Sequence, residues 1–167
     1  MRQAPGQPQA VYNAWLRGLT PCSRSSVFSG PTDFSGAACN CIRAASELAE
    51  HFDAELILIN VVPAVPTLPP DPNYVFKIPE YEMYLHADAE KQLRKAREEL
   101  VGKNVKVRTM VGHGSAAEEI VLVAKKDSVD LIVISTHGST GFERWVFGSV
   151  AEKVVRQADC PVLTVRQ

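Results

Sequence analysis

The sequence predicts a single α/β domain built on an open, twisted sheet of parallel strands. Two short apolar runs, residues 56–59 and 131–134, are rich in branched side chains and show no polar alternation, which is typical of strands covered on both faces. Between the strand candidates, apolar residues recur every three or four positions, as on one face of a helix. Strands that alternate with amphipathic helices require βαβ crossovers. We therefore expect five parallel strands with helices on both faces of the sheet.

The first strand is the least apolar of the five. Within residues 25–30, only Val27 and Phe28 are strongly apolar, whereas a central strand is normally apolar throughout. We place a strand here because a helix is expected over residues 37–52 and needs one before it. The intervening residues 31–35, Pro-Thr-Asp-Phe-Ser, have the turn chemistry of a strand-to-helix loop.

The remaining elements follow the same patterns. Residues 105–111 alternate between apolar and polar side chains, which predicts a strand with one wetter face at a sheet edge. Residues 162–165 are the fifth strand candidate. Helical periods cover residues 85–100, 117–124 and 147–158.

A proline-rich stretch interrupts this rhythm. Residues 63–79 contain six prolines, too many for a regular helix or strand. We expect a long loop. Its length is compatible both with a lid near a site and with a plain linker.

Composition excludes several classes of protein. The 167 residues suit one domain, and no apolar stretch reaches the roughly 18 residues of a membrane-spanning helix. The 18 Lys and Arg nearly balance the 19 Asp and Glu, so the chain lacks the basic excess that nucleic-acid binding requires. We expect neither a membrane nor a nucleic acid as partner.

The near-neutral charge hides an asymmetry. Residues 1–32 hold three arginines and no acidic residue, so residues 33–167 carry a net charge of −4. We expect residues 1–24 to form a poorly ordered extension and residues 25–167 to form the domain. The four cysteines occur without a secretory signal, which favours reduced thiols and a cytoplasmic location.

Chemistry is expected at the carboxyl ends of the strands. In an open parallel sheet, ligands bind there, where the strand order reverses. The loops that follow the first and fourth strands are residues 31–33 and 135–138, and the second continues to Gly148 and Ser149 at the start of the last helix. Glycine and hydroxyl residues that open a helix let backbone N–H groups approach an anion. The spacing is neither a Walker loop nor G-x-G-x-x-G, but phosphate is the expected ligand group.

Three stretches show a more specific likeness. They are residues 130–138 (Asp-Leu-Ile-Val-Ile-Ser-Thr-His-Gly), residues 148–154 (Gly-Ser-Val-Ala-Glu-Lys-Val) and residues 160–163 (Cys-Pro-Val-Leu). Together with the loop at residues 31–35, they resemble the universal stress protein family over about residues 25–167. The resemblance implies a Rossmann-like sheet with the strand order 3-2-1-4-5.

The family's nucleotide motif is G-x-x-G-x9-G-[ST]. Gly138, the nine-residue gap, Gly148 and Ser149 are kept here, while Ser135 replaces the first glycine. A serine adds bulk where the backbone needs positive φ or a close approach to ligand, although its hydroxyl can donate a hydrogen bond.

The positions that the resemblance assigns to the nucleotide fall into three groups. The base and ribose group is Pro31, Thr32, Asp33 and Val61. The group lining the nucleotide is Ile134, Ser135 and Gly138. The phosphate group is Gly148, Ser149, Val150 and Ala151. Two structural alternatives remain open: Asp33 can simply organise the turn before the first helix, and Gly148 and Ser149 can simply form a helix start, with Ser149 as its cap.

The resemblance implies a stress-response module that binds ATP or a related adenine nucleotide such as AMP, with or without Mg²⁺, and reports that state to an unidentified regulatory protein. It also implies a homodimer formed through the last strand, residues 162–165, whose exposed edge offers unpaired backbone groups. A nucleotide-free interaction module is the first alternative and a slow ATPase the second. The sequence shows no catalytic base, metal cluster or nucleophile triad, which disfavours a dedicated enzyme.

Overall fold

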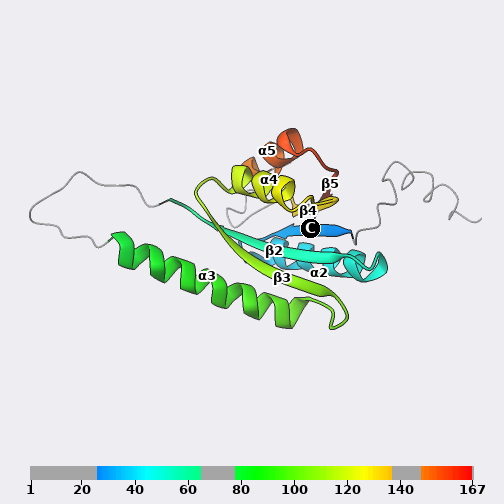
Figure 1. The fold of residues 1–167 in the computed structure, drawn as a ribbon, viewed down its shortest axis with the longest axis horizontal. Helices are drawn as coiled ribbons and strands as arrows, with labels where there is room; N and C mark the ends of the chain where they lie inside the picture. Colours follow the sequence, from blue (N-terminus) through cyan, green and yellow to red (C-terminus); the bar gives the residue numbers. More distant parts are fainter. Residues whose placement is uncertain (1–25, 65–77, 137–147, 167) are drawn as a thin grey trace, which may run out of the picture.

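The computed structural model describes residues 26–64, 78–136 and 148–166 of the chain. Its strands form one parallel sheet in the order β3-β2-β1-β4-β5 (Figure 1). The expected fold class and strand order are therefore confirmed. In chain order the elements are β1 (Val27–Pro31), α2 (Gly36–His51), β2 (Glu55–Val62), α3 (Ile78–Leu100), β3 (Lys106–His113), α4 (Ala116–Lys126), β4 (Leu131–Ser135), α5 (Ser149–Gln157) and β5 (Val162–Val165).

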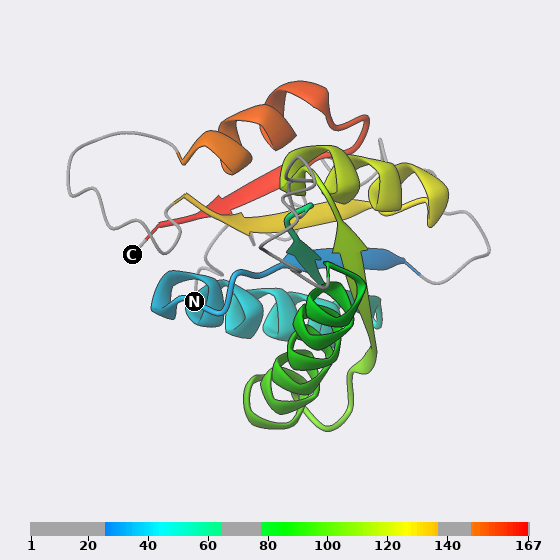
Figure 2. The ribbon, with the colours of Figure 1, turned by 90° about the vertical axis from the view of Figure 1, so that its left-hand side faces the viewer.

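Helices cover both faces of the sheet. Figure 2 shows α2 and α3 on one face and α4 and α5 on the other. Leu56 and Leu58 of β2 belong to the core on the α2 and α3 side, whereas Ile57 and Ile59 belong to the core on the α4 and α5 side. All four side chains are at most 1% exposed. Burial on both faces explains why the sequence of β2 shows no polar alternation.

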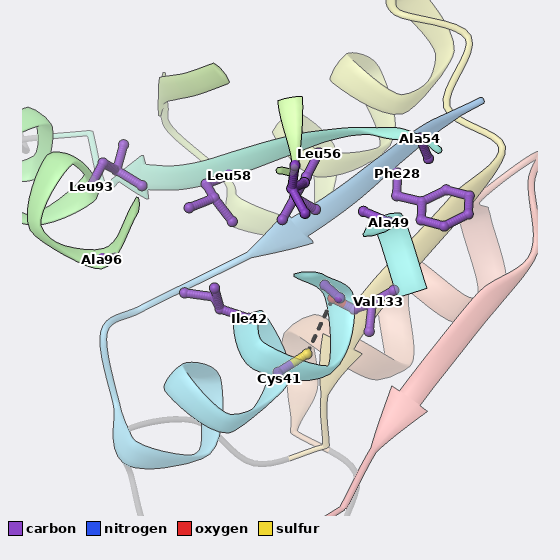
Figure 3. Close-up of a cluster of buried hydrophobic side chains, with 12 residues drawn as sticks. Phe28, Cys41, Ile42, Ala49, Ala54, Leu56, Leu58, Leu93, Ala96 and Val133 are labelled. Atoms are coloured by element: carbon purple, nitrogen blue, oxygen red, sulfur yellow. Dashed lines mark hydrogen bonds between the residues drawn. The ribbon is translucent and has the colours of Figure 1, made fainter. Parts of the chain in front are cut away.

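The core between α2 and the sheet includes a cysteine. The Cys41 thiol donates a hydrogen bond to the Val133 carbonyl at 3.3 Å (Figure 3). Burial raises the pKa of Cys41 to about 12, so the thiol stays protonated at neutral pH. Because the thiolate is the nucleophile, Cys41 serves packing rather than chemistry. Cys39, Cys41 and Cys160, the three cysteines in the described ranges, form no disulfide.

β1 lies at the centre of the sheet although its sequence is weakly apolar. It spans residues 27–31, slightly later than the expected residues 25–30. A Cβ on Gly30 would lie 3.3 Å from Leu58 Cδ2, so the missing side chain lets the neighbouring core residues pack closely. Pro31, which has no N–H, stands last, where the strand is about to leave the sheet.

α3 begins earlier than the helical period predicts. It starts at Ile78, and Pro79 falls in its first turn, where a missing N–H leaves no intrahelical bond unmade. The expected proline-rich loop therefore ends before residue 79, and its residues 65–77 lie outside the described part of the chain. β3 stands at a sheet edge, as its alternating pattern predicts.

Within the three described ranges, no helix combines the length and the apolar character that crossing a bilayer requires.

Two buried serines give opposite expectations for stability. The Ser29 hydroxyl is fully buried in β1 and has no hydrogen-bond partner among the described residues. The Ser46 hydroxyl, 4% exposed, accepts the Gly102 N–H at 2.9 Å. We expect Ser29→Ala to leave the free energy of unfolding unchanged or to raise it by up to about 1 kcal/mol, because a buried polar group without a partner is removed.

Urea denaturation of both alanine variants measures this. The matched control, Ser46→Ala, is expected to lose about 1 kcal/mol because it leaves the Gly102 N–H without its acceptor. An equal loss in Ser29→Ala would show that the Ser29 hydroxyl is satisfied in solution.

Candidate functional site

β1 and β4 part before they end, and a cavity lies where they separate. β1 pairs with β2 along its whole length, from Val27–Glu55 to Pro31–Ile59. It pairs with β4 only at Phe28–Leu131 and Ser29–Ile132. Beyond these rungs lies a cavity of about 260 Å³, slightly below the roughly 300–1,000 Å³ of typical small-molecule sites. This is the switch point at which the sequence predicts a ligand.

The cavity brings together residues that are far apart in the sequence. They come from the ends of β1, β2 and β4 and from α2, α4 and the start of α5. The described lining consists of Pro31, Thr32, Asp33, Ala38, Ile59, Asn60, Val61, Ala116, Ile120, Ile134, Ser135, Thr136, Gly148, Ser149, Val150 and Ala151.

Ten of the eleven positions that the resemblance assigns to a nucleotide lie in this lining, and the eleventh, Gly138, lies outside the described residues. The motif did not identify the six others, Ala38, Ile59, Asn60, Ala116, Ile120 and Thr136. Two of these six are direct sequence neighbours of assigned positions, which could have indicated them: Asn60 precedes Val61, and Thr136 follows Ser135.

The lining has an apolar wall and very little charge. Ile59, Ile120 and Ile134 are each at most 5% exposed and belong to the core beneath α4 and α5. Asp33 is the single charged side chain among the described lining residues. Among the described lining residues, attraction for an anion can therefore come from backbone groups and not from basic side chains.

The loop after β1 is held by short-range hydrogen bonds. The Thr32 hydroxyl accepts the Phe34 N–H at 3.0 Å, and the Asp33 carboxylate accepts the Ser35 N–H at 3.0 Å. Phe34 adopts a positive φ of 62°, and the Ser35 hydroxyl caps α2 through the Ala38 N–H at 3.2 Å. The turn-organising alternative for Asp33 is thus observed, and the exposed Asp33 still borders the cavity.

The start of α5 is fixed by the end of β4. The Gly148 N–H donates to the Thr136 carbonyl at 2.8 Å, and the Thr136 N–H donates to the Val165 carbonyl at 3.1 Å. Gly148 is the N-cap of α5, and as a glycine it provides no side-chain cap. The alternative in which Ser149 caps α5 is therefore wrong, because Ser149 is already the first helical residue.

The first turn of α5 provides backbone N–H groups at the cavity. The Gly148 N–H is used within the protein. The N–H groups of Ser149, Val150 and Ala151 occupy the first turn of α5, where the helix itself offers no acceptor. The helix dipole adds partial positive charge at the same place.

Ser135 occupies the position of the motif's first glycine without strain. It is the last residue of β4 and pairs with Val165. The non-glycine residues with positive φ in the described ranges are Phe34, Asp53 and Ser128, so the backbone at Ser135 does not require glycine. The substitution therefore changes the space at the cavity wall and leaves the course of the strand intact.

In residues 26–64, 78–136 and 148–166, no three or more His, Cys, Asp or Glu side chains are grouped so that they could hold a metal ion.

The fold and the site together define an α/β protein of the doubly wound type, with a ligand-sized cavity at its switch point. The model of the universal stress protein family matches residues 30–166. The chain belongs to the universal stress protein family, as its motifs predict.

Known proteins agree with this assignment. The chain is 40% identical to universal stress protein MJ0531 of Methanocaldococcus jannaschii over 139 residues, which is 82% of this chain and 79% of the relative. The solved structure of UspA from Lactobacillus plantarum has a TM-score of 0.73 at 26% identity and covers 86% of this chain and 99% of its own.

A more distant neighbour carries a ligand. The universal stress protein of Archaeoglobus fulgidus in complex with dAMP has a TM-score of 0.53 at 19% identity, and the match covers 84% of this chain and 97% of that one. At this identity the likeness concerns the fold alone.

A side chain at position 148 is expected to lower the stability of the protein. A Cβ there would lie 3.2 Å from the Thr136 carbonyl oxygen, a backbone atom that cannot swing aside. We expect Gly148→Ala to lower the free energy of unfolding by about 1 kcal/mol, because it strains the bond that fixes α5 and places a poor residue at the N-cap.

Gly102→Ala is the matched control, since its added Cβ would meet nothing closer than a side-chain oxygen at 3.4 Å. Urea denaturation of both variants decides the point. Equal stability of the two variants would contradict the prediction, because it would mean that the Thr136 carbonyl shifts to accept a Cβ at position 148 without a loss of stability.

Proposed function

We propose that this chain binds ATP or a related adenine nucleotide such as AMP in the cavity between β1 and β4, and that it acts as a nucleotide-dependent regulatory module. One observation carries the proposal: an apolar wall, a carboxylate and the start of a helix line the same cavity. These are the groups that a base, a ribose and a phosphate need.

The base is assigned to the β2 side of the cavity. Pro31, Ile59 and Val61 offer an apolar surface there against which a flat ring can pack. The exposed Asp33 carboxylate is assigned to the ribose, because it can accept hydrogen bonds from two hydroxyl groups. The hydrogen bond from the Ser35 N–H sets the orientation of this carboxylate.

The phosphates are assigned to the start of α5. The N–H groups of Ser149, Val150 and Ala151 and the Ser149 hydroxyl are the donors at this end. They lie on one helical turn held to the sheet through Gly148, so binding does not have to order them first. A protein of the same family in complex with dAMP supports an adenine mononucleotide as the ligand class.

Mg²⁺ is assigned no protein site. Asp33 is the single carboxylate in the described lining, and in this assignment it lies at the ribose rather than at the phosphates. An accompanying Mg²⁺ would take its ligands from phosphate oxygens and water, a common arrangement for this ion.

Asp33→Asn tests the ribose assignment while sparing the turn. The amide oxygen can still accept the Ser35 N–H, but the negative charge is lost and one acceptor becomes a donor. We expect ATP and AMP to bind about tenfold more weakly to this variant, as measured by calorimetric titration. Asp159→Asn is the matched control and is expected to bind like the unaltered protein. Asp159 is exposed and lies just before the amino end of β5, outside the cavity lining.

The same titration separates the alternatives. No heat with the unaltered protein at millimolar ATP, and no nucleotide in an extract of the purified protein, would leave the nucleotide-free interaction module as the function. Saturable phosphate release from ATP that Asp33→Asn abolishes would favour the hydrolase.

We also propose that the regulatory module is a homodimer paired through β5. β5 is the outer strand of the described sheet, and its Leu163 is 41% exposed. An open strand edge with an apolar side chain beside it favours pairing with another strand. The occupant proposed is β5 of a second copy.

Light scattering tests the dimer. Leu163→Glu is expected to shift the mass toward that of one chain, because it places charge in the interface. Leu122→Glu, on α4 and 56% exposed, is the matched control and should leave the mass unchanged. A monomeric mass for the unaltered protein would contradict the dimer.

A further inference from the structure

The backbone ladder between β1 and β2 ends at a definite rung. The Ile59 carbonyl accepts the Thr32 N–H at 2.8 Å, so the Ile59 backbone faces β1. The Val62 carbonyl accepts the Gly114 N–H at 2.9 Å, so the Val62 backbone faces β3. Because successive residues of a strand direct their backbone groups to opposite neighbours, Val61 faces the β1 side, like Ile59.

Continuing the ladder would pair the Val61 N–H with the Thr32 carbonyl. That carbonyl instead accepts the side-chain amide of Asn60 at 2.8 Å. The Thr32 carbonyl makes no hydrogen bond with the Val61 N–H. Since a carbonyl oxygen can accept two hydrogen bonds, the Asn60 amide acts through the direction in which it holds this carbonyl, at the point where β1 turns away toward α2. Val61, Thr32 and Asn60 all line the cavity.

The Asn60 bond also anchors the loop that carries Asp33. Thr32 is held through its N–H to Ile59 and through its carbonyl to Asn60, while its hydroxyl orients the Phe34 N–H. Fixing Thr32 at both backbone groups fixes the direction in which the chain enters Asp33.

We propose that Asn60 is a positioning residue of the nucleotide cavity: its amide holds the Thr32 carbonyl away from Val61, which leaves the Val61 N–H directed at the ligand and sets the Asp33 loop. This inference rests on the proposed function, because it assigns the Val61 N–H to an acceptor atom of the bound base. Asparagine suits the role since it is short and carries a neutral donor, whereas a carboxylate would repel the carbonyl.

Loss of the amide has a specific structural consequence. Without Asn60, the Thr32 carbonyl is free to accept the Val61 N–H, and the ladder closes by one rung. In Asn60→Ala we therefore expect the Val61 amide of the ligand-free protein to exchange its proton more slowly than in the unaltered protein. A residue that only stabilised the fold would produce the opposite change on removal.

Three variants test the inference, with adenosine and AMP as the probes. Asn60→Ala is expected to bind both about tenfold more weakly in calorimetric titrations. Asn104→Ala is the matched control, because its amide donates to Glu50 at 3.0 Å on an exposed surface outside the cavity lining. It is expected to change neither the affinity nor the exchange of the Val61 amide.

Asn60→Asp adds a pH signature. The introduced carboxyl cannot donate to the Thr32 carbonyl when it is ionised but can do so when it is protonated. Its position beside a carbonyl in a partly buried site favours the protonated form and raises its pKa. Affinity for adenosine, which carries no titrating phosphate, is expected to recover in this variant as the pH falls from about 8 to about 5, while the unaltered protein and Asn60→Ala stay flat.

The outcomes separate this inference from the proposed function. If the unaltered protein binds neither probe, the proposed function fails, and the exchange of the Val61 amide alone decides whether Asn60 blocks the rung. If the unaltered protein binds and Asn60→Ala binds equally well with unchanged Val61 exchange, the positioning role of Asn60 is overturned.

Discussion

The early separation of β1 and β4 is the constraint on which the site depends. From β1 the chain crosses to α2 on one face of the sheet, and from β4 it leads to α5 on the other. Two neighbouring strands whose chains leave toward opposite faces cannot continue their ladder, and pairing stops after Ser29–Ile132. The cavity is therefore a consequence of the strand order, and residues at the ends of β1, β2 and β4 line it.

Charge bears on how the proposed phosphate site could work. Residues 33–167 carry a net charge of −4, and no described lining residue is basic, so neither the net charge of this part of the chain nor a described lining side chain attracts a phosphate. In the proposed function, a short-range donor set would attract the phosphate, because N–H groups at a helix start act within hydrogen-bond distance, where the screened field of distant carboxylates is weak. The donors are effective only if α5 is held in place, which the Thr136–Gly148 bond ensures.

The sequence predicts the architecture well because its signals are local. The continuous apolar run of β2 and the alternation in β3 follow directly from burial on two faces and on one. The site residues recovered by the motif, such as Asp33 and Ser149, also sit in short, recognisable stretches. Asn60 escapes this reasoning because its role depends on a carbonyl 28 positions earlier in the chain, and no periodicity reports such a contact.

The differences in boundaries have the same origin. The sequence of β1 is weakly apolar because Ser29 and Gly30 occupy buried central positions. The close packing of Leu58 that favours glycine at position 30 is a tertiary contact, which the sequence pattern does not show. The sequence allowed Ser149 as the cap of α5. In the structure the cap is Gly148, whose N–H donates to the Thr136 carbonyl. Tertiary contacts thus decide the ends of elements whose middles are set by local pattern.

The two proposals for ligand and dimer are connected by a short path. The Thr136 backbone donates to Val165 at the end of β5 and accepts from Gly148 at the start of α5. A partner strand that steadies β5 would therefore steady the phosphate end of the cavity through two hydrogen bonds. Binding free energies at two linked sites are reciprocal, so a nucleotide bound at the start of α5 would favour the proposed dimer. In the proposed regulatory module, Thr136 would link the pocket that senses a ligand to the surface that a partner recognises.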